Sequence, residues 1–236
     1  MKTVWLQRDG QRQALIFFAG WGMDERPFRR LTSSQYDVCV CFDYRDLDMD
    51  FHSSQLPLSG QTPSSASQPN QAHVPYEAVT VVAWSFGCAV AAQVMAREMW
   101  PVRHALAING TVTPEDDEVG IPRQWLEATA ESLLQGDGWP KFVRRMCMDK
   151  AARQDFQAHA PQRDLAGAVE ELQTLRSLKT PAACGFDRAL VGTKDRIILP
   201  ENQQRGWSRF DVPVQSLAAP HYPFHLWSTW EELLSA

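Results

Sequence analysis

The sequence predicts an α/β fold with a mostly parallel central sheet, and three observations lead to this class. Near-continuous apolar runs of strand length recur along the chain, as expected for strands buried on both faces of a parallel sheet. An Ala-rich helical stretch directly follows one such run, which is the order of a strand–helix–strand unit. The chain has 236 residues, 44% of them hydrophobic and 22% charged, so its composition is that of one globular domain.

The expected core elements follow one another along the chain. Apolar runs predict strands at residues 13–19, 36–43, 79–84, 102–109, 187–193 and 211–218. Helices are expected over 27–34, after Ser85 and from Trp227 to Ala236. Residues 1–111 and 181–236 therefore form the predicted core, with helices on both faces of the sheet.

A helical block interrupts this alternation between residues 112 and 180. Helices are expected at about 121–134, 140–158 and 164–178, and no strand signal separates them. A block inserted between two strands of a parallel sheet lies over the carboxyl edge, where ligands bind in open α/β folds. We therefore predict that residues 112–180 form a lid on a single structural domain.

A second interruption has a different composition. Residues 52–75 contain six Ser, four Gln and four Pro and no Asp, Glu, Lys or Arg. Such low-complexity sequence cannot supply a core, so it predicts a surface loop in place of a helix.

Charge and cysteine usage argue against several classes of protein. The 23 basic and 28 acidic side chains give a net charge of −5, whereas non-specific nucleic-acid binders carry a basic excess. No apolar run approaches 18 residues, and the first ten residues lack the apolar centre of a signal peptide. Five Cys without a CxxC pair predict a reduced, cytoplasmic protein without a zinc site.

The strongest chemical signal is the pentapeptide Ala83-Trp84-Ser85-Phe86-Gly87. It follows an apolar strand and opens the Ala-rich helix, which is the context of the nucleophile elbow in the α/β-hydrolase fold. The usual motif has Gly where Ala83 stands, so the match is incomplete. The alternative is that Ser85 merely caps the helix that follows it.

Asp195 and His221 complete a predicted catalytic triad. In the α/β-hydrolase fold the nucleophile is followed along the chain by the acid and then by His. Asp195 comes just after strand 187–193 and His221 just after strand 211–218, so both are expected at the edge that bears Ser85. His225 is an alternative base, and Asp43, at the end of another strand, is an alternative acid.

The expected oxyanion hole combines two backbone N–H groups. One belongs to Phe86, the residue after the nucleophile, and the other comes from the loop after the first main strand. In that loop Gly20 and Gly22 flank Trp21, whose N–H is the candidate donor. A plain glycine turn around a core Trp is the alternative.

Five segments taken together resemble one known family. They are Phe17–Asp24, Asp43–Arg45, Trp84–Gly87, Ala107–Thr111 and Gly192–Asp195. In this order they look like the BioG family, pimeloyl-acyl-carrier-protein methyl ester esterases with an α/β-hydrolase fold. The departures are Ala83 and the segment 52–75.

The resemblance implies both residue roles and a reaction. It implies Ser85 as nucleophile, Asp195 as acid, His221 as base, and Trp21 and Phe86 at the oxyanion hole. The implied reaction cleaves the methyl ester of pimeloyl-acyl-carrier protein and releases methanol in biotin synthesis. Because such a triad works without a metal or organic cofactor, none is expected.

Two alternatives to this function remain open. A generic carboxylesterase or thioesterase of the same fold would carry the same triad, because pocket shape sets the acyl group. From another class, the chain could be a non-catalytic binder of acyl-carrier protein that has kept the elbow.

Basic residues concentrate in the predicted lid. Residues 139–163 carry six Lys or Arg against two Asp, although the whole chain is acidic. An acidic carrier protein needs a basic docking surface, and Arg144, Arg145 and Arg153 are the candidates. A solvated helix face is the alternative.

Aromatic residues are the candidates for substrate contacts. The chain contains nine Trp, and apolar lining is normal in ligand pockets. Trp21, Trp84, Trp139 and Phe142 are expected near the acyl chain. Packing of the lid on the core is the alternative for Trp139 and Phe142.

Overall fold

A computed structural model describes residues 1–47, 76–136 and 138–236, and the predicted loop at 52–75 lies outside these residues. The described residues form a seven-stranded sheet with the order β1-β3-β2-β4-β5-β6-β7. Every neighbouring pair is parallel except β1 with β3. The predicted mostly parallel α/β class is therefore confirmed. The strands are Lys2–Gln7 (β1), Gln13–Phe18 (β2), Tyr36–Phe42 (β3), Ala78–Trp84 (β4), Val102–Ile108 (β5), Arg188–Gly192 (β6) and Val214–Leu217 (β7).

The central strands are buried over most of their length. In β2, β3 and β4 every residue after the first is buried, which explains their continuous apolar sequence. The edge strand β1 was not predicted because its side chains are only partly buried and its sequence is mixed. The last predicted strand, 211–218, is shorter than expected, since β7 covers only Val214–Leu217.

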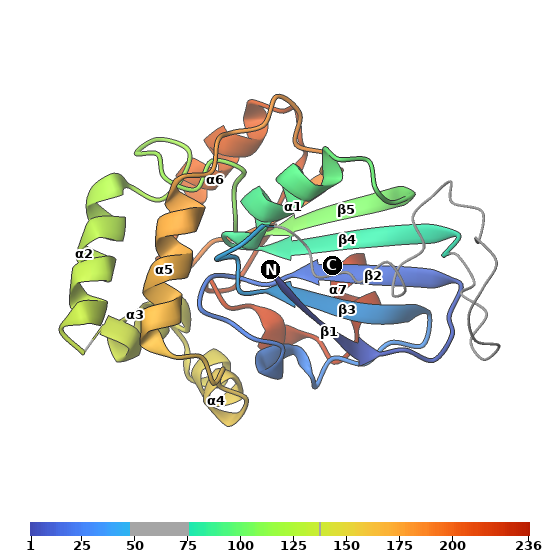
Figure 1. Cartoon of the computed structure of the whole chain (residues 1–236), viewed down its shortest axis with the longest axis horizontal. Helices are drawn as coiled ribbons and strands as arrows, with labels where there is room; N and C mark the ends of the chain where they lie inside the picture. The colour runs from blue at the N-terminus through green and yellow to red at the C-terminus, as the bar shows by residue number, and fades with distance from the viewer. Residues whose placement is uncertain (48–75, 137) are drawn as a thin grey trace.

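Few helices cover the core sheet. Figure 1 shows α1 (Gly87–Met95) in front of the sheet and α7 (Trp230–Ser235) behind it. The helix predicted over 27–34 is a single 3-10 turn, η1 (Arg26–Phe28), and a second turn, η2 (Phe224–Leu226), precedes α7. The helix α6 (Pro200–Ser208) was missed because its mostly polar sequence lacks an apolar repeat.

Between β5 and β6 the chain forms a group of helices beyond the carboxyl ends of the strands, at the left of Figure 1. These are α2 (Arg123–Leu134), α3 (Gly138–Met146), α4 (Lys150–Ala158) and α5 (Leu165–Arg176). We call this group the lid. The single helix predicted over 140–158 is divided, because the Asp149 carboxylate accepts the Ala152 N–H and starts α4 anew.

An aromatic cluster fills the core below the lid. Phe17 packs edge-on against Phe28 and Phe224, and Trp84 contacts the same two rings. Edge-to-face pairs of this kind stabilise a core beyond the area they bury. Within the described residues no helix is both long and apolar enough to span a membrane.

Candidate active site

Ser85 lies in a tight turn between β4 and α1. Its φ of 58° is rare for a residue with a side chain and is the strained geometry of a nucleophile elbow. Gly87 is required at the next bend, because a Cβ there would lie 2.4 Å from the Phe18 carbonyl oxygen. Ala83 stands where the usual motif has Gly and is fully buried near the end of β4.

The structure brings Ser85, His221 and Asp195 together. His221 Nε2 lies 2.9 Å from Ser85 Oγ, and His221 Nδ1 lies 2.7 Å from Asp195 Oδ2. All three side chains are nearly inaccessible to water, with at most 4% of each residue exposed. A proton can therefore pass from the serine hydroxyl to an imidazole that a buried carboxylate orients.

The alternative base and acid lie elsewhere. The nearest carboxylate to His225 is Asp149, at 3.9 Å from its Nε2, and His225 has no contact with Ser85. Asp43 is occupied by ion pairs with Lys2 and Arg45. Neither residue takes part in the Ser85 arrangement.

Asp195 is held rigidly by its own loop and by α6. Its Oδ1 accepts the N–H groups of Ile197 at 2.8 Å and Ile198 at 3.0 Å. Its Oδ2, which faces His221, also accepts a hydrogen bond from Gln203 Nε2 at 2.8 Å. Gln203 lies on α6, the helix that the sequence pattern did not reveal, so its part in the site could not be foreseen.

The loop that carries His221 is fixed from two neighbouring strand ends. Asn109, just after β5, donates from Nδ2 to the carbonyl oxygens of Pro220 at 2.9 Å and His221 at 3.0 Å. Its Oδ1 accepts the Gly192 N–H at 2.6 Å. Trp84 Nε1 also donates to the His221 carbonyl at 2.8 Å. A polar residue directly after an apolar strand was the available signal for Asn109.

Two backbone N–H groups close to Ser85 lack an acceptor. Among the hydrogen bonds of the described residues, none has the Trp21 N–H or the Phe86 N–H as donor. The loop that carries Trp21 passes so close that a Cβ on Gly20 would lie 2.9 Å from the Trp84 ring and 3.3 Å from Ser85 Cβ. Buried amides are normally paired, so these two are available to a ligand oxygen.

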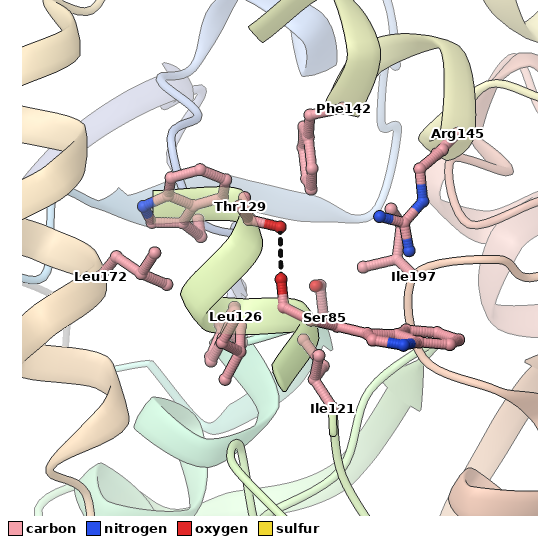
Figure 2. A pocket seen from close by; sticks show the side chains of 11 residues that line it. Ser85, Ile121, Leu126, Thr129, Phe142, Arg145, Leu172 and Ile197 are labelled. Atoms are coloured by element: carbon pink, nitrogen blue, oxygen red, sulfur yellow. Dashed lines mark hydrogen bonds between the residues drawn. The ribbon is translucent and has the colours of Figure 1, made fainter. Parts of the chain in front are cut away.

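A small, mostly apolar cavity of about 20 Å³ lies against Ser85 and below the lid. In Figure 2, Phe142 and Arg145 of α3 face Ser85 across it. The volume holds about one water molecule. The lining residues are Trp21, Ser85, Phe86, Ile121, Trp125, Leu126, Thr129, Phe142, Arg145, Leu172 and Ile197.

The four aromatic candidates for substrate contact divide into two groups. Trp21 and Phe142 line the cavity. Trp84 lies beneath the site, with its ring centre 5.4 Å from that of His221. Trp139 packs behind the other two, with ring centres 6.1 Å from Trp21 and 5.7 Å from Phe142. Trp84 and Trp139 thus support the lining without forming it.

The three arginines predicted to dock a partner have different surroundings. Arg144 is exposed, while Arg145 and Arg153 are partly buried. Arg145 lies over the Trp125 ring at 5.3 Å and donates to the Arg196 carbonyl at 3.0 Å. Burial lowers the pKa of Arg145, an effect that the negative charge of Asp195 opposes.

Comparisons with known proteins identify the family and the fold of this chain. The model of the family described as pimeloyl-ACP methyl esterase BioG matches residues 1–57 and 70–233. The structure is similar to that of BioG from Haemophilus influenzae, with a TM-score of 0.81 and 29% identity over 99% of both chains. A putative aryl esterase from Burkholderia cenocepacia has a TM-score of 0.64 and 18% identity, covering 99% of this chain and 89% of that one, and shows likeness of fold alone.

Two relatives show how the chain compares in length. An uncharacterized protein of Haemophilus influenzae is 30% identical over 238 residues and 99% of both chains. A malonyl-[acyl-carrier protein] O-methyltransferase of Bacteroides fragilis is 36% identical over 215 residues, which cover 90% of this chain but only 40% of that protein. The family model covers nearly the whole chain, and the fold is that of the α/β-hydrolases. This chain therefore belongs to the BioG family and is an ester hydrolase.

Proposed function

We propose that this protein hydrolyses the methyl ester of a pimeloyl group carried by acyl-carrier protein, with Ser85, His221 and Asp195 as its catalytic triad. The observation that carries this proposal is the chain of contacts from Ser85 through His221 to Asp195, at 2.9 and 2.7 Å, beside an apolar cavity. Membership of the BioG family supports the substrate.

The geometry supports acyl transfer in two stages. Ser85 Oγ attacks the ester carbonyl carbon while His221 Nε2 takes its proton, and Asp195 stabilises the imidazolium. The N–H groups of Trp21 and Phe86 bind the oxyanion. When the carbon–oxygen bond breaks, His221 returns the proton to the leaving methoxide, which departs as methanol. Water then attacks the acyl-enzyme with His221 as base, which frees the acid and restores Ser85.

Access to the site requires a change in the lid. The cavity of about 20 Å³ is far smaller than the roughly 300–1,000 Å³ of typical ligand pockets. Its roof comes from α2 and α3, where Thr129 and Phe142 face the cavity. We therefore place the acyl chain between these helices and the core, in a form of the lid more open than the one described.

A basic groove beside the cavity suits the carrier protein. It lies between α2 and α3 and is lined in part by Lys141, Arg144 and Arg145. Thr129, Phe142 and Arg145 line both this groove and the cavity, so the two are adjacent. An acidic protein bound at the groove would hold its acyl chain at the entrance to the site. The malonyl-[acyl-carrier protein] named in the Bacteroides fragilis relative supports a carrier-bound substrate.

The decisive assay compares methyl pimeloyl-acyl-carrier protein with short p-nitrophenyl esters at equal enzyme concentration. We expect kcat/KM for the carrier-linked ester to exceed the others by orders of magnitude, with one methanol released per turnover. Equal kcat/KM values would instead favour a generic carboxylesterase or thioesterase. Failure of a fluorophosphonate probe to label Ser85 would favour a non-catalytic carrier-protein binder.

A further inference from the structure

A fully buried acid joins the lid to the loop that carries Trp21. Glu171, on α5, has no exposed surface. Its Oε2 accepts the Gly22 N–H at 3.1 Å and its Oε1 accepts the Tyr44 N–H at 2.9 Å. One carboxylate from the lid thus fixes two backbone amides of the core, after β2 and after β3.

The charge of Glu171 is balanced by one arginine, which lies in the loop just before α5. Arg163 Nη1 lies 2.7 Å from Glu171 Oε2, and Arg163 Nη2 lies 2.9 Å from Asp43 Oδ1. Burial raises the pKa of Glu171, while Arg163 and the two N–H groups oppose the rise. Burial also acts on Asp43, but hydrogen bonds from Arg45 and Lys2 hold its pKa well below the usual range.

The same helix holds Trp21, the residue of the proposed oxyanion donor, through the peptide that follows it and through its side chain. The Gly22 N–H belongs to the peptide that follows Trp21, so its bond to Glu171 sets the plane of that peptide. Trp21 Nε1 donates to the Ala168 carbonyl at 2.6 Å, one turn earlier on α5. The φ of 73° at Gly22 lets the chain turn sharply between these two anchors.

We infer that Glu171 is a positioning residue for the oxyanion hole, acting through the Trp21–Gly22 peptide. The Trp21 N–H lies in the preceding peptide, whose Gly20 carbonyl accepts the Met23 N–H at 3.3 Å, so Glu171 acts on it across the Trp21 Cα. The direction of this N–H then depends on α5 being docked, so the lid completes the catalytic site as well as covering it. This inference rests on the proposed function, since it takes the Trp21 N–H as an oxyanion donor. Oxyanion donors act only when aimed at the developing charge, which makes their orientation critical.

Glu171→Gln tests the inference. The amide has one acceptor oxygen where the carboxylate has two, so its NH₂ group would face one of the two backbone N–H groups that the carboxylate binds. With p-nitrophenyl butyrate we expect kcat to fall about 10–100-fold and KM to change less than about twofold. The affinity for a trifluoromethyl ketone, whose adduct with Ser85 places an oxyanion in the hole, should weaken by the same factor as kcat/KM.

Glu170→Gln is the matched control. Glu170 is the preceding residue on α5, is exposed, and pairs with Arg45 at 3.3 Å without contact to the Trp21 loop. This variant should keep wild-type kcat, KM and inhibitor affinity. If Glu171→Gln behaves in the same way, or loses kcat with no loss of inhibitor affinity, the inference is overturned.

Glu171→Asp keeps the test valid if the amide variant does not fold. It retains the charge beside Arg163 but is one methylene too short to reach both amides, so kcat should again fall with KM unchanged. Wild-type kcat in a folded Glu171→Asp variant would contradict the inference. Failure of the proposed function gives a different pattern, in which Ser85→Ala stays active or the wild type does not hydrolyse the ester.

Discussion

The two sides of the candidate site are built on different principles. On the sheet side Ser85, Asp195 and His221 each follow a strand, and main-chain pairing of β4 to β7 sets their places. On the lid side Leu126 and Phe142 contact the cavity from helices that rest on the core through side chains. The proposed catalytic groups thus follow strands of the sheet, while the proposed substrate-facing groups lie on helices packed over it.

The lid itself repeats this contrast. The helix α5 is anchored by the buried pair of Arg163 and Glu171 and by backbone N–H groups of the core. The helix α3 packs on the core through the aromatic rings of Trp139 and Phe142, which contact Trp21, and it forms hydrogen bonds to the core near its C-terminal end, at Arg145 and Met146. Directional contacts suit the positioning role inferred for α5, and non-directional packing around Phe142 suits the proposed roof over an acyl chain.

The largest expected effect is on the sheet side. Ser85→Ala should lower kcat by about 10⁴–10⁶-fold for any ester, because the attacking group is lost. The melting temperature should stay close to that of the wild type, since only one hydroxyl is removed. The loss of kcat would be measured by steady-state kinetics with p-nitrophenyl butyrate, together with fluorophosphonate labelling. Retention of most esterase activity would refute the nucleophile assignment.

A second change on the sheet side tests whether His221 depends on its support. Asn109→Ala removes a buried amide that bonds Pro220, His221 and Gly192. We expect a loss of about 1–3 kcal/mol in the free energy of unfolding, measured by urea denaturation. Turnover should fall roughly tenfold through a misplaced base. An unchanged kcat would mean that the other hydrogen bonds of the His221 loop, from Trp84 and between Tyr222 and Met146, are enough to hold it.

On the lid side the effect should depend on the substrate. Phe142→Ala removes an apolar wall of the cavity, so binding of a long acyl chain should weaken by about 1–2 kcal/mol, or roughly 5–30-fold in KM. The KM for p-nitrophenyl acetate should change little, because its acyl group is too short to reach the wall. Equal losses for p-nitrophenyl heptanoate and acetate would mean that Phe142 supports the triad instead.

The smallest effect is expected at the outer rim of the lid. Arg144→Glu should raise KM severalfold for the carrier-linked ester and leave small free esters unaffected, with the difference shrinking at high salt. Arg145→Glu differs, because Arg145 also lines the cavity, and it should impair small esters as well. If Arg144→Glu impairs both substrates equally, the groove is not a docking surface.

Sequence patterns captured the central strands of the sheet, which are buried over most of their length. The apolar runs of β2, β3, β4 and β5 and the turn at Ser85 are local signals, so the parallel sheet and the serine's place on it were predictable. The edge strand β1 and the polar helix α6 were not predicted, because their stability comes from neighbouring elements that the local sequence does not show. The break between α3 and α4 was not predicted for a similar reason, since Asp149 acts as a helix cap only because the chain turns there.

The sequence by itself determined the order of the chemistry: a serine, an acid and a histidine, each after an apolar strand, and a glycine-flanked tryptophan. Parallel strands end at one edge, so chain order alone was enough to predict that these groups meet. Only the tertiary structure decided what holds and covers them. Asn109 and Glu171 reach the site across long separations in sequence, and Gln203 reaches it from a polar helix without an apolar repeat, through directional hydrogen bonds that no local pattern encodes.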